Sequence, residues 1–158
     1  MLVTRRTIEW KPLLFFFLYT FILAGIGILL SGSPSTEGLT MPPLAPPDWL
    51  FPVAWTILYS LMSVAAYLVF VSGDIDRGPA LRLYLLQVLV NILWPLFFFR
   101  LEWRLFAFFW LLLLLILVVL TAWRFKPIAR VAYLLLLPYI AWLLFAGYLN
   151  LGIYLLNR

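Results

Sequence analysis

Five long runs of hydrophobic residues alternate along the chain with short segments rich in charged residues, proline and glycine. A helix needs about 20 predominantly apolar residues to cross the hydrocarbon core of a bilayer, and each run approaches or exceeds that length. At these lengths only helices satisfy their own backbone hydrogen bonds within hydrocarbon. The pattern therefore predicts an all-α integral membrane protein, a five-transmembrane-helix bundle forming one domain over 1–158, with helices at 13–30, 49–71, 80–99, 105–123 and 128–156.

The composition supports this class and excludes several kinds of chemistry. The chain is 66% hydrophobic and 11% charged, whereas a soluble domain is about half apolar and about a quarter charged. It contains no cysteine and no histidine, so disulfides, thiolate chemistry and the commonest general base and metal ligand are absent. The six carboxylates lie in or near loops, which argues against a metal site. We expect no required cofactor.

The basic residues are distributed unequally between the two ends of the predicted bundle. One end holds Arg5, Arg6, Lys11, Arg77, Arg82, Arg124, Lys126 and Arg130, and the other holds Arg100, Arg104 and Arg158. The positive-inside rule therefore predicts a cytoplasmic N-terminus and an outward-facing loop at 31–48. Topology and lipid headgroup contact explain the net charge of +5 better than nucleic acid does. Three tryptophans at predicted helix ends are expected at the membrane interface: Trp10, Trp103 and Trp123.

A proline-rich loop runs directly into a membrane helix in the segment PPLAPPDWLFPVAWTILY, which begins at Pro42. The prolines before Asp48 favour an extended path. Asp48 then stands where a helix N-cap is expected, because its carboxylate can accept the free N–H groups of a first turn. Trp55 and Tyr59 are four residues apart, so they share one face of the helix that follows.

Two further predicted helices carry aromatic and amide side chains on one face. The face of the third helix holds Tyr84, Gln87, Asn91 and Trp94, and that of the fifth holds Trp142, Phe145, Ala146 and Leu149. Buried amides need partners in a membrane, so the third helix should turn this face inward. Pro95 is expected to kink it. The fourth helix is almost purely Leu, Phe and Val, which predicts a lipid-facing wall.

These faces together predict an apolar pocket with a few polar groups, suited to a flat hydrophobic ligand. Two other interpretations stay open. Aromatic stripes in membrane helices also arise from packing alone. Gln87 and Asn91 can also form hydrogen bonds with each other or with the first helix, instead of with a ligand.

Three segments of the chain resemble the TspO/MBR family, the tryptophan-rich sensory proteins and translocator proteins, also called peripheral-type benzodiazepine receptors. They are PPDWLFPVAWTILYSLMS from Pro46, LQVLVNILWPLFFF from Leu86 and LPYIAWLLFAGYLN from Leu137. The resemblance implies a five-helix bundle, often a homodimer, with a ligand pocket below the loop between the first two helices. This chain departs from the family pattern at Pro43 and Leu44, where family members usually carry a tryptophan.

The resemblance also implies ligands and residue roles. Family members bind porphyrins such as protoporphyrin IX and other haem-related tetrapyrroles, and some are reported to degrade protoporphyrin in light. The matching pocket positions are Trp55, Asn91, Trp94, Trp142 and Ala146, with Tyr59 carried over less directly. Trp142 matches the tryptophan implicated in the photochemistry, and it is the one candidate catalytic residue.

We therefore expect a membrane receptor or carrier that binds porphyrins or other planar hydrophobic molecules. The expected ligand-binding residues are Trp55, Tyr59, Gln87, Asn91, Trp94, Trp142, Phe145 and Ala146. Lipid and a second copy of the chain are expected partners, and the bacterial cell membrane is the expected location. Two alternatives are a light-dependent porphyrin-degrading enzyme and an assembly or regulatory protein without ligand turnover. A transporter is disfavoured, because intramembrane charges and an inverted repeat are missing.

Overall fold

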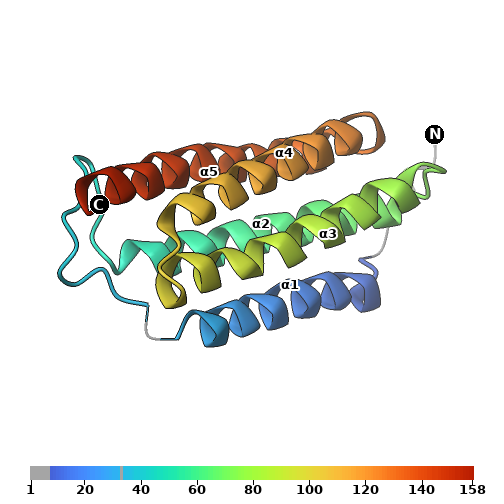
Figure 1. Cartoon of the computed structure of the whole chain (residues 1–158). Coiled ribbons are helices and arrows are strands. Elements are labelled where there is room, and N and C mark those ends of the chain that lie inside the picture. Colours follow the sequence, from blue (N-terminus) through green and yellow to red (C-terminus); the bar gives the residue numbers. More distant parts are fainter. Residues whose placement is uncertain (1–7, 33) are drawn as a thin grey trace.

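The structure, a computed structural model, describes residues 8–32 and 34–158, and it is a bundle of long helices (Figure 1). Within those residues there are five long helices and no strand. All five are long and apolar enough to cross a membrane, so the predicted five-helix integral membrane fold is confirmed. The helices are α1 (Trp10–Ser31), α2 (Leu50–Val71), α3 (Arg77–Pro95), α4 (Arg104–Ile128) and α5 (Arg130–Leu156), with a short π-helix, η1 (Leu96–Arg100), after α3.

The connection between α4 and α5 is shorter than the sequence predicts. The segment 124–127, expected to be a turn, continues α4 to Ile128, and only Ala129, in an extended conformation, separates the two helices. Phe125 is fully buried, which favours the helical path. Pro127 lies in the last turn, where its missing N–H removes only one hydrogen bond. The predicted turn here was wrong, because burial outweighed the breaker residue.

The start of α2 also differs from the prediction. The N-cap is Trp49, and no side chain caps the helix. The Asp48 carboxylate instead accepts a hydrogen bond from the Thr36 hydroxyl at 3.1 Å. The Asp48 cap was therefore wrong. The Asp48 side chain instead links two distant parts of the loop that joins α1 and α2.

An irregular segment follows Pro95, where the sequence predicts a kink. The α-helical geometry ends at Pro95 and the chain continues as the π-helix η1. A wider turn is a usual way to accommodate a break in the helical hydrogen bonds. The π-helix ends with the Leu101 N–H donating to the Leu96 carbonyl at 2.9 Å, and the chain then turns into α4.

The core extends along the middle of the bundle, and α4 contributes to it. Leu111, Leu114 and Val118 of α4 are almost completely buried, whereas Phe109 and Ile116 are exposed. The predicted lipid-facing wall is thus only one side of α4, because the other side packs on α3 and α5. The predicted inward face of α3 is confirmed by Tyr84, Gln87 and Asn91, which are all buried.

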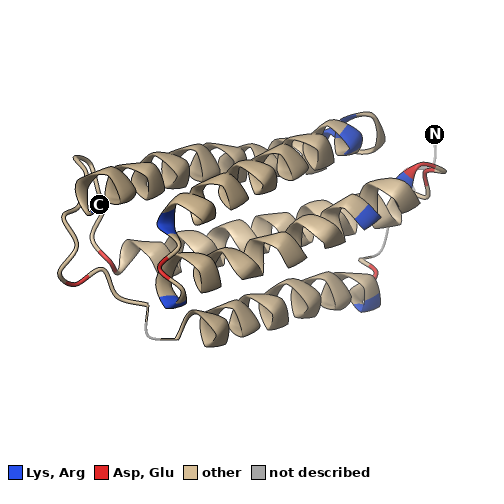
Figure 2. Ribbon diagram, in the orientation of Figure 1, with Lys and Arg blue, Asp and Glu red and all other residues tan. Residues whose placement is uncertain are grey.

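Charged residues gather at the ends of the helices, and the middle of the bundle has none among the described residues (Figure 2). This is the distribution that a membrane-spanning bundle needs. Arg5 and Arg6, which enter the predicted orientation, lie outside the described residues. The three belt tryptophans are between 56% and 70% exposed. The direction in which the chain crosses the membrane stays a prediction.

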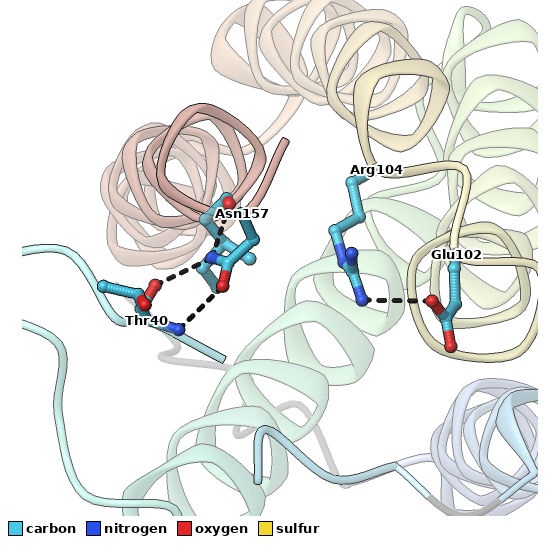
Figure 3. A network of polar contacts seen from close by, with 5 residues as sticks. Thr40, Glu102, Arg104 and Asn157 are labelled. Atoms are coloured by element: carbon cyan, nitrogen blue, oxygen red, sulfur yellow. Dashed lines mark hydrogen bonds and ion pairs between the residues drawn. The ribbon is translucent and has the colours of Figure 1, made fainter. Parts of the chain in front are cut away.

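The loop between α1 and α2 is docked on the C-terminal end of α5. Asn157 donates through Nδ2 to the Thr40 carbonyl and accepts from the Thr40 N–H, at 2.9 and 2.8 Å (Figure 3). The Tyr148 hydroxyl donates to the Pro43 carbonyl at 2.6 Å. The Pro42 ring lies directly against Gly152, where an added Cβ would meet the Pro42 Cβ at 2.8 Å. These contacts fix the loop over one end of the bundle.

Candidate functional site

A cavity of about 610 Å³ lies beneath this loop, with walls from α1, α2, α3 and α5. Six of the eight predicted ligand-binding residues line it: Trp55, Tyr59, Asn91, Trp94, Trp142 and Ala146. Residues of the α1–α2 loop close it at one end, among them Thr36, Met41 and Asp48. The volume is within the usual range of small-molecule sites, about 300–1,000 Å³. The structure therefore brings the three predicted faces to one space.

Aromatic rings on α2 and α5 form a continuous wall of the cavity. Trp55 stacks on Tyr59, with ring centroids 5.2 Å apart. It meets Trp142 edge to face at 6.4 Å, and Phe51 meets Trp142 in the same way at 6.0 Å. Such pairs hold rings in defined orientations. The wall thus presents a preformed aromatic surface to a flat molecule.

Trp94 is held from two sides on the α3 wall. Its ring stacks on Phe98 at 4.9 Å. Its Nε1 donates to the Asn150 Oδ1 at 3.0 Å, and the Asn150 Nδ2 donates to the Arg104 carbonyl at 2.8 Å. Asn150 thereby ties α5 to α3 and to the start of α4. Its role was missed from sequence, because helical spacing places it only at the edge of the α5 face.

Replacing Asn150 with leucine should lower the free energy of unfolding by about 1–3 kcal/mol, because the Trp94 N–H and the Arg104 carbonyl would lose their partner. Equilibrium unfolding in mixed micelles, followed by circular dichroism, measures this change. The matched control is Gln87→Leu, which removes an equally buried amide that has no partner among the described residues. It should be neutral or stabilising. Equal losses in both variants would contradict the bridging role of Asn150.

Two nitrogen donors in the cavity wall have no acceptor among the described residues. The Trp142 Nε1 and the Asn91 Nδ2 are buried and have no hydrogen-bond partner among the described residues, although the Asn91 side chain lies beside the Tyr59 hydroxyl. Buried donors are normally paired. Both belong to residues that line the cavity, so an acceptor on a bound molecule would satisfy them.

Gln87 and Phe145 do not line the cavity. Gln87 is completely buried within the bundle, and both polar atoms of its amide lack partners among the described residues. The alternative expected from sequence, a hydrogen bond from Gln87 to Asn91 or to the first helix, is therefore not formed among the described residues. Phe145 packs against the Trp142 ring, with centroids 5.8 Å apart. Phe145 therefore supports the Trp142 ring and does not itself face the cavity.

The first helix was expected to enclose the site, but none of its residues was predicted individually to line it. It contributes Phe21, Gly25, Gly27 and Ser31. Gly27 lies so close to α3 that an added Cβ would be 3.2 Å from the Ile92 carbonyl oxygen. The paired glycines were the available signal in the sequence, since small residues let membrane helices approach closely.

The charged residues near the α1–α2 loop line two different hollows of the structure. Asp48 is the one charged residue that lines the cavity among the described residues. Arg104 and Arg158 instead line a separate hollow of about 560 Å³ between the start of α4 and the end of α5. Arg104 pairs there with Glu102 at 3.3 Å (Figure 3). No group of three or more potential metal ligands occurs in the part of the chain that the structure describes.

Comparisons with known proteins agree with this architecture. The TspO/MBR family profile matches residues 11–156. The tryptophan-rich protein TspO of Chlorobaculum tepidum is 38% identical over 123 residues, which cover 75% of this chain and 77% of the relative. The protein of the same name from Archaeoglobus fulgidus is 37% identical over 144 residues, 86% and 94% of the two chains. Protein CrtK of Rhodobacter capsulatus is 35% identical, with 83% of each chain covered.

Proposed function

Because this chain belongs to the TspO/MBR family, we propose that it is a membrane receptor or carrier for planar hydrophobic ligands, a porphyrin such as protoporphyrin IX or another tetrapyrrole. The observation that carries this proposal is the convergence of Trp55, Trp94 and Trp142, from three different helices, on one cavity of about 610 Å³. Flat aromatic walls with few polar groups favour a flat, largely apolar molecule.

In this proposal the ring system of the ligand lies against the wall formed by Trp55 and Trp142, and Trp94 contacts it from α3. Asn91 and the Trp142 indole offer their unpaired N–H groups to acceptors on the ligand. The α1–α2 loop, docked on α5 through Asn157, closes the site. The positive-inside rule supports a location of this loop outside the cytoplasm.

The test is a titration of tryptophan fluorescence with protoporphyrin IX in the dark, using the full chain in a non-ionic detergent. We expect saturable quenching. The paired substitution Trp55→Phe and Trp142→Phe should weaken binding about tenfold or more, because aromatic pairs contribute about 0.5–1.5 kcal/mol each. The control pair is Trp103→Phe and Trp123→Phe, which changes exposed indoles at helix ends and should leave the affinity unchanged.

Quenching that does not saturate, or that is indifferent to the Trp55 and Trp142 substitutions, would mean that the porphyrin only partitions into the micelle. The proposed function would then be wrong. A binding-deficient variant that still associates with partner proteins as the wild type does would favour the assembly role instead.

A further inference from the structure

We propose that the cavity selects uncharged ligands over dianionic ones, and that Asp48 is the residue that sets this preference. The ligand class is a planar ring system whose peripheral groups are neutral hydrogen-bond acceptors, such as esters or amides, instead of free carboxylates. This inference rests on the proposed function and refines its ligand. It differs from the expectation of a free dicarboxylate porphyrin as the preferred ligand.

The loop that closes the cavity is acidic. Between Ser31 and Trp49 the chain contains two acidic residues, Glu37 and Asp48, and no lysine or arginine. In Figure 2 this loop carries acidic positions and no basic one. Residues of the same loop belong to the cavity lining. Asp48 is exposed and lines the cavity, and its carboxylate accepts a hydrogen bond from the Thr36 hydroxyl, which also belongs to the lining. A carboxylate on a ligand that reached the loop would therefore meet a like charge.

The cations at this end of the bundle do not line the cavity. Arg104 and Arg158 line the separate hollow between α4 and α5, and Arg104 is already paired with Glu102. Arg100 lies at the end of η1, is exposed, and is not part of the cavity lining. A carboxylate that leaves water without a cation loses its hydration and gains no compensating charge.

The polar groups that are available suit a neutral acceptor. The Asn91 Nδ2 and the Trp142 Nε1 are neutral donors without partners among the described residues. An ester or amide carbonyl would satisfy them with little desolvation cost. A carboxylate would accept the same bonds but would also bring its charge into the apolar wall. The donors can pair with either ligand, and the acidic loop together with the lack of a cation in the described lining favours the uncharged one.

The experiment compares protoporphyrin IX with its dimethyl ester, which has the same ring and no carboxylates. Both are titrated in the dark into the full chain in a non-ionic detergent. Protein-free micelles that contain N-acetyltryptophanamide give the background from micelle partitioning. We expect the ester to bind about tenfold more tightly than the diacid. Raising the ionic strength should reduce this difference by strengthening diacid binding, because salt screens the repulsion.

Asp48→Asn tests the residue itself. Asparagine keeps an oxygen that can accept the hydrogen bond from the Thr36 hydroxyl, so this contact within the loop is retained. The diacid should then bind about threefold to tenfold more tightly, with the ester unchanged. Glu37→Gln is the matched control, because Glu37 is an equally exposed acid of the same loop that lies outside the cavity lining. It should change neither affinity.

The outcomes separate the two proposals. If both porphyrins bind saturably and the diacid binds as tightly as the ester or more so, the selectivity is wrong and the proposed function stands. An ester preference that Asp48→Asn leaves unchanged overturns the role of Asp48. If neither porphyrin gives saturable binding above the protein-free background, the proposed function itself is wrong.

Discussion

Replacing Gly152 with alanine is expected to release the α1–α2 loop from α5 and to speed the dissociation of a bound porphyrin about tenfold. The new Cβ would be 2.8 Å from the Pro42 Cβ and 3.0 Å from its Cγ. Real contacts of this kind are longer, and a proline ring cannot rotate away. Overpacking of this kind costs about 1–3 kcal/mol, and 1.4 kcal/mol corresponds to a factor of ten. Stopped-flow recovery of tryptophan fluorescence measures the rate.

The control for this substitution is Gly147→Ala on the same helix. A Cβ at Gly147 would have an ordinary contact, 3.6 Å from a Leu111 methyl group. Alanine is a better helix former than glycine by about 1 kcal/mol, so both substitutions favour α5 itself. Faster release in the Gly152 variant alone would therefore come from the loop. Identical rates in the two variants would contradict the proposed closure of the cavity by this loop.

The helices and the inward faces were predictable because the membrane imposes strong local rules. Every backbone polar group must be paired within hydrocarbon, which leaves long apolar runs only one common structure. A side chain such as Asn91 is costly to expose to lipid, so its position alone indicates which side of α3 faces the interior. Helical spacing then places Trp94 on the same face, and it brings Trp55 and Trp142 to the same cavity from their own helices.

The loop contacts were not predictable, because they join residues far apart in the chain that carry no periodic signal. Thr40 and Asn157 are 117 residues apart, and neither belongs to a recognised pattern. Asp48 has the residue type and position of a helix cap, yet its carboxylate is used by Thr36. Local propensity and tertiary contact compete for such a side chain, and sequence reveals only the first. The same reason explains why the bridging role of Asn150 was missed.

Gln87 shows the limit of assigning function by helical face. It lies one turn from Asn91 on α3 and is just as buried, but it falls outside the cavity lining. A face defined by spacing runs the whole length of a helix, whereas the cavity occupies only the part near the α1–α2 loop. Depth along the helix therefore decides which of two equivalent amides meets the ligand, and depth depends on how the loop closes the bundle.

Replacing Trp142 with phenylalanine is expected to abolish any light-dependent loss of bound porphyrin, while binding weakens only severalfold. We propose this photochemistry as a second activity of the same cavity. In it the excited porphyrin takes an electron from the Trp142 indole, which leaves a porphyrin radical anion and an indole radical cation. Dissolved dioxygen then reacts with the porphyrin radical as the oxidant, and the indole radical recovers its electron from the reduced oxygen species. Trp142 is the candidate donor because it lines the cavity and meets Trp55 edge to face at 6.4 Å. Phenylalanine keeps a ring in the wall but is much harder to oxidise.

The decisive comparison is with Trp94→Phe, which removes another indole from the same cavity. Trp94 differs from Trp142 because its N–H is bonded to Asn150. Absorption spectra of the bound porphyrin, recorded during illumination of samples matched for occupancy, measure the loss. We expect it to persist in the Trp94 variant and to stop in the Trp142 variant. Equal loss in wild type and both variants would assign the reaction to the porphyrin and dissolved oxygen alone, and the protein would then be a binding protein without turnover.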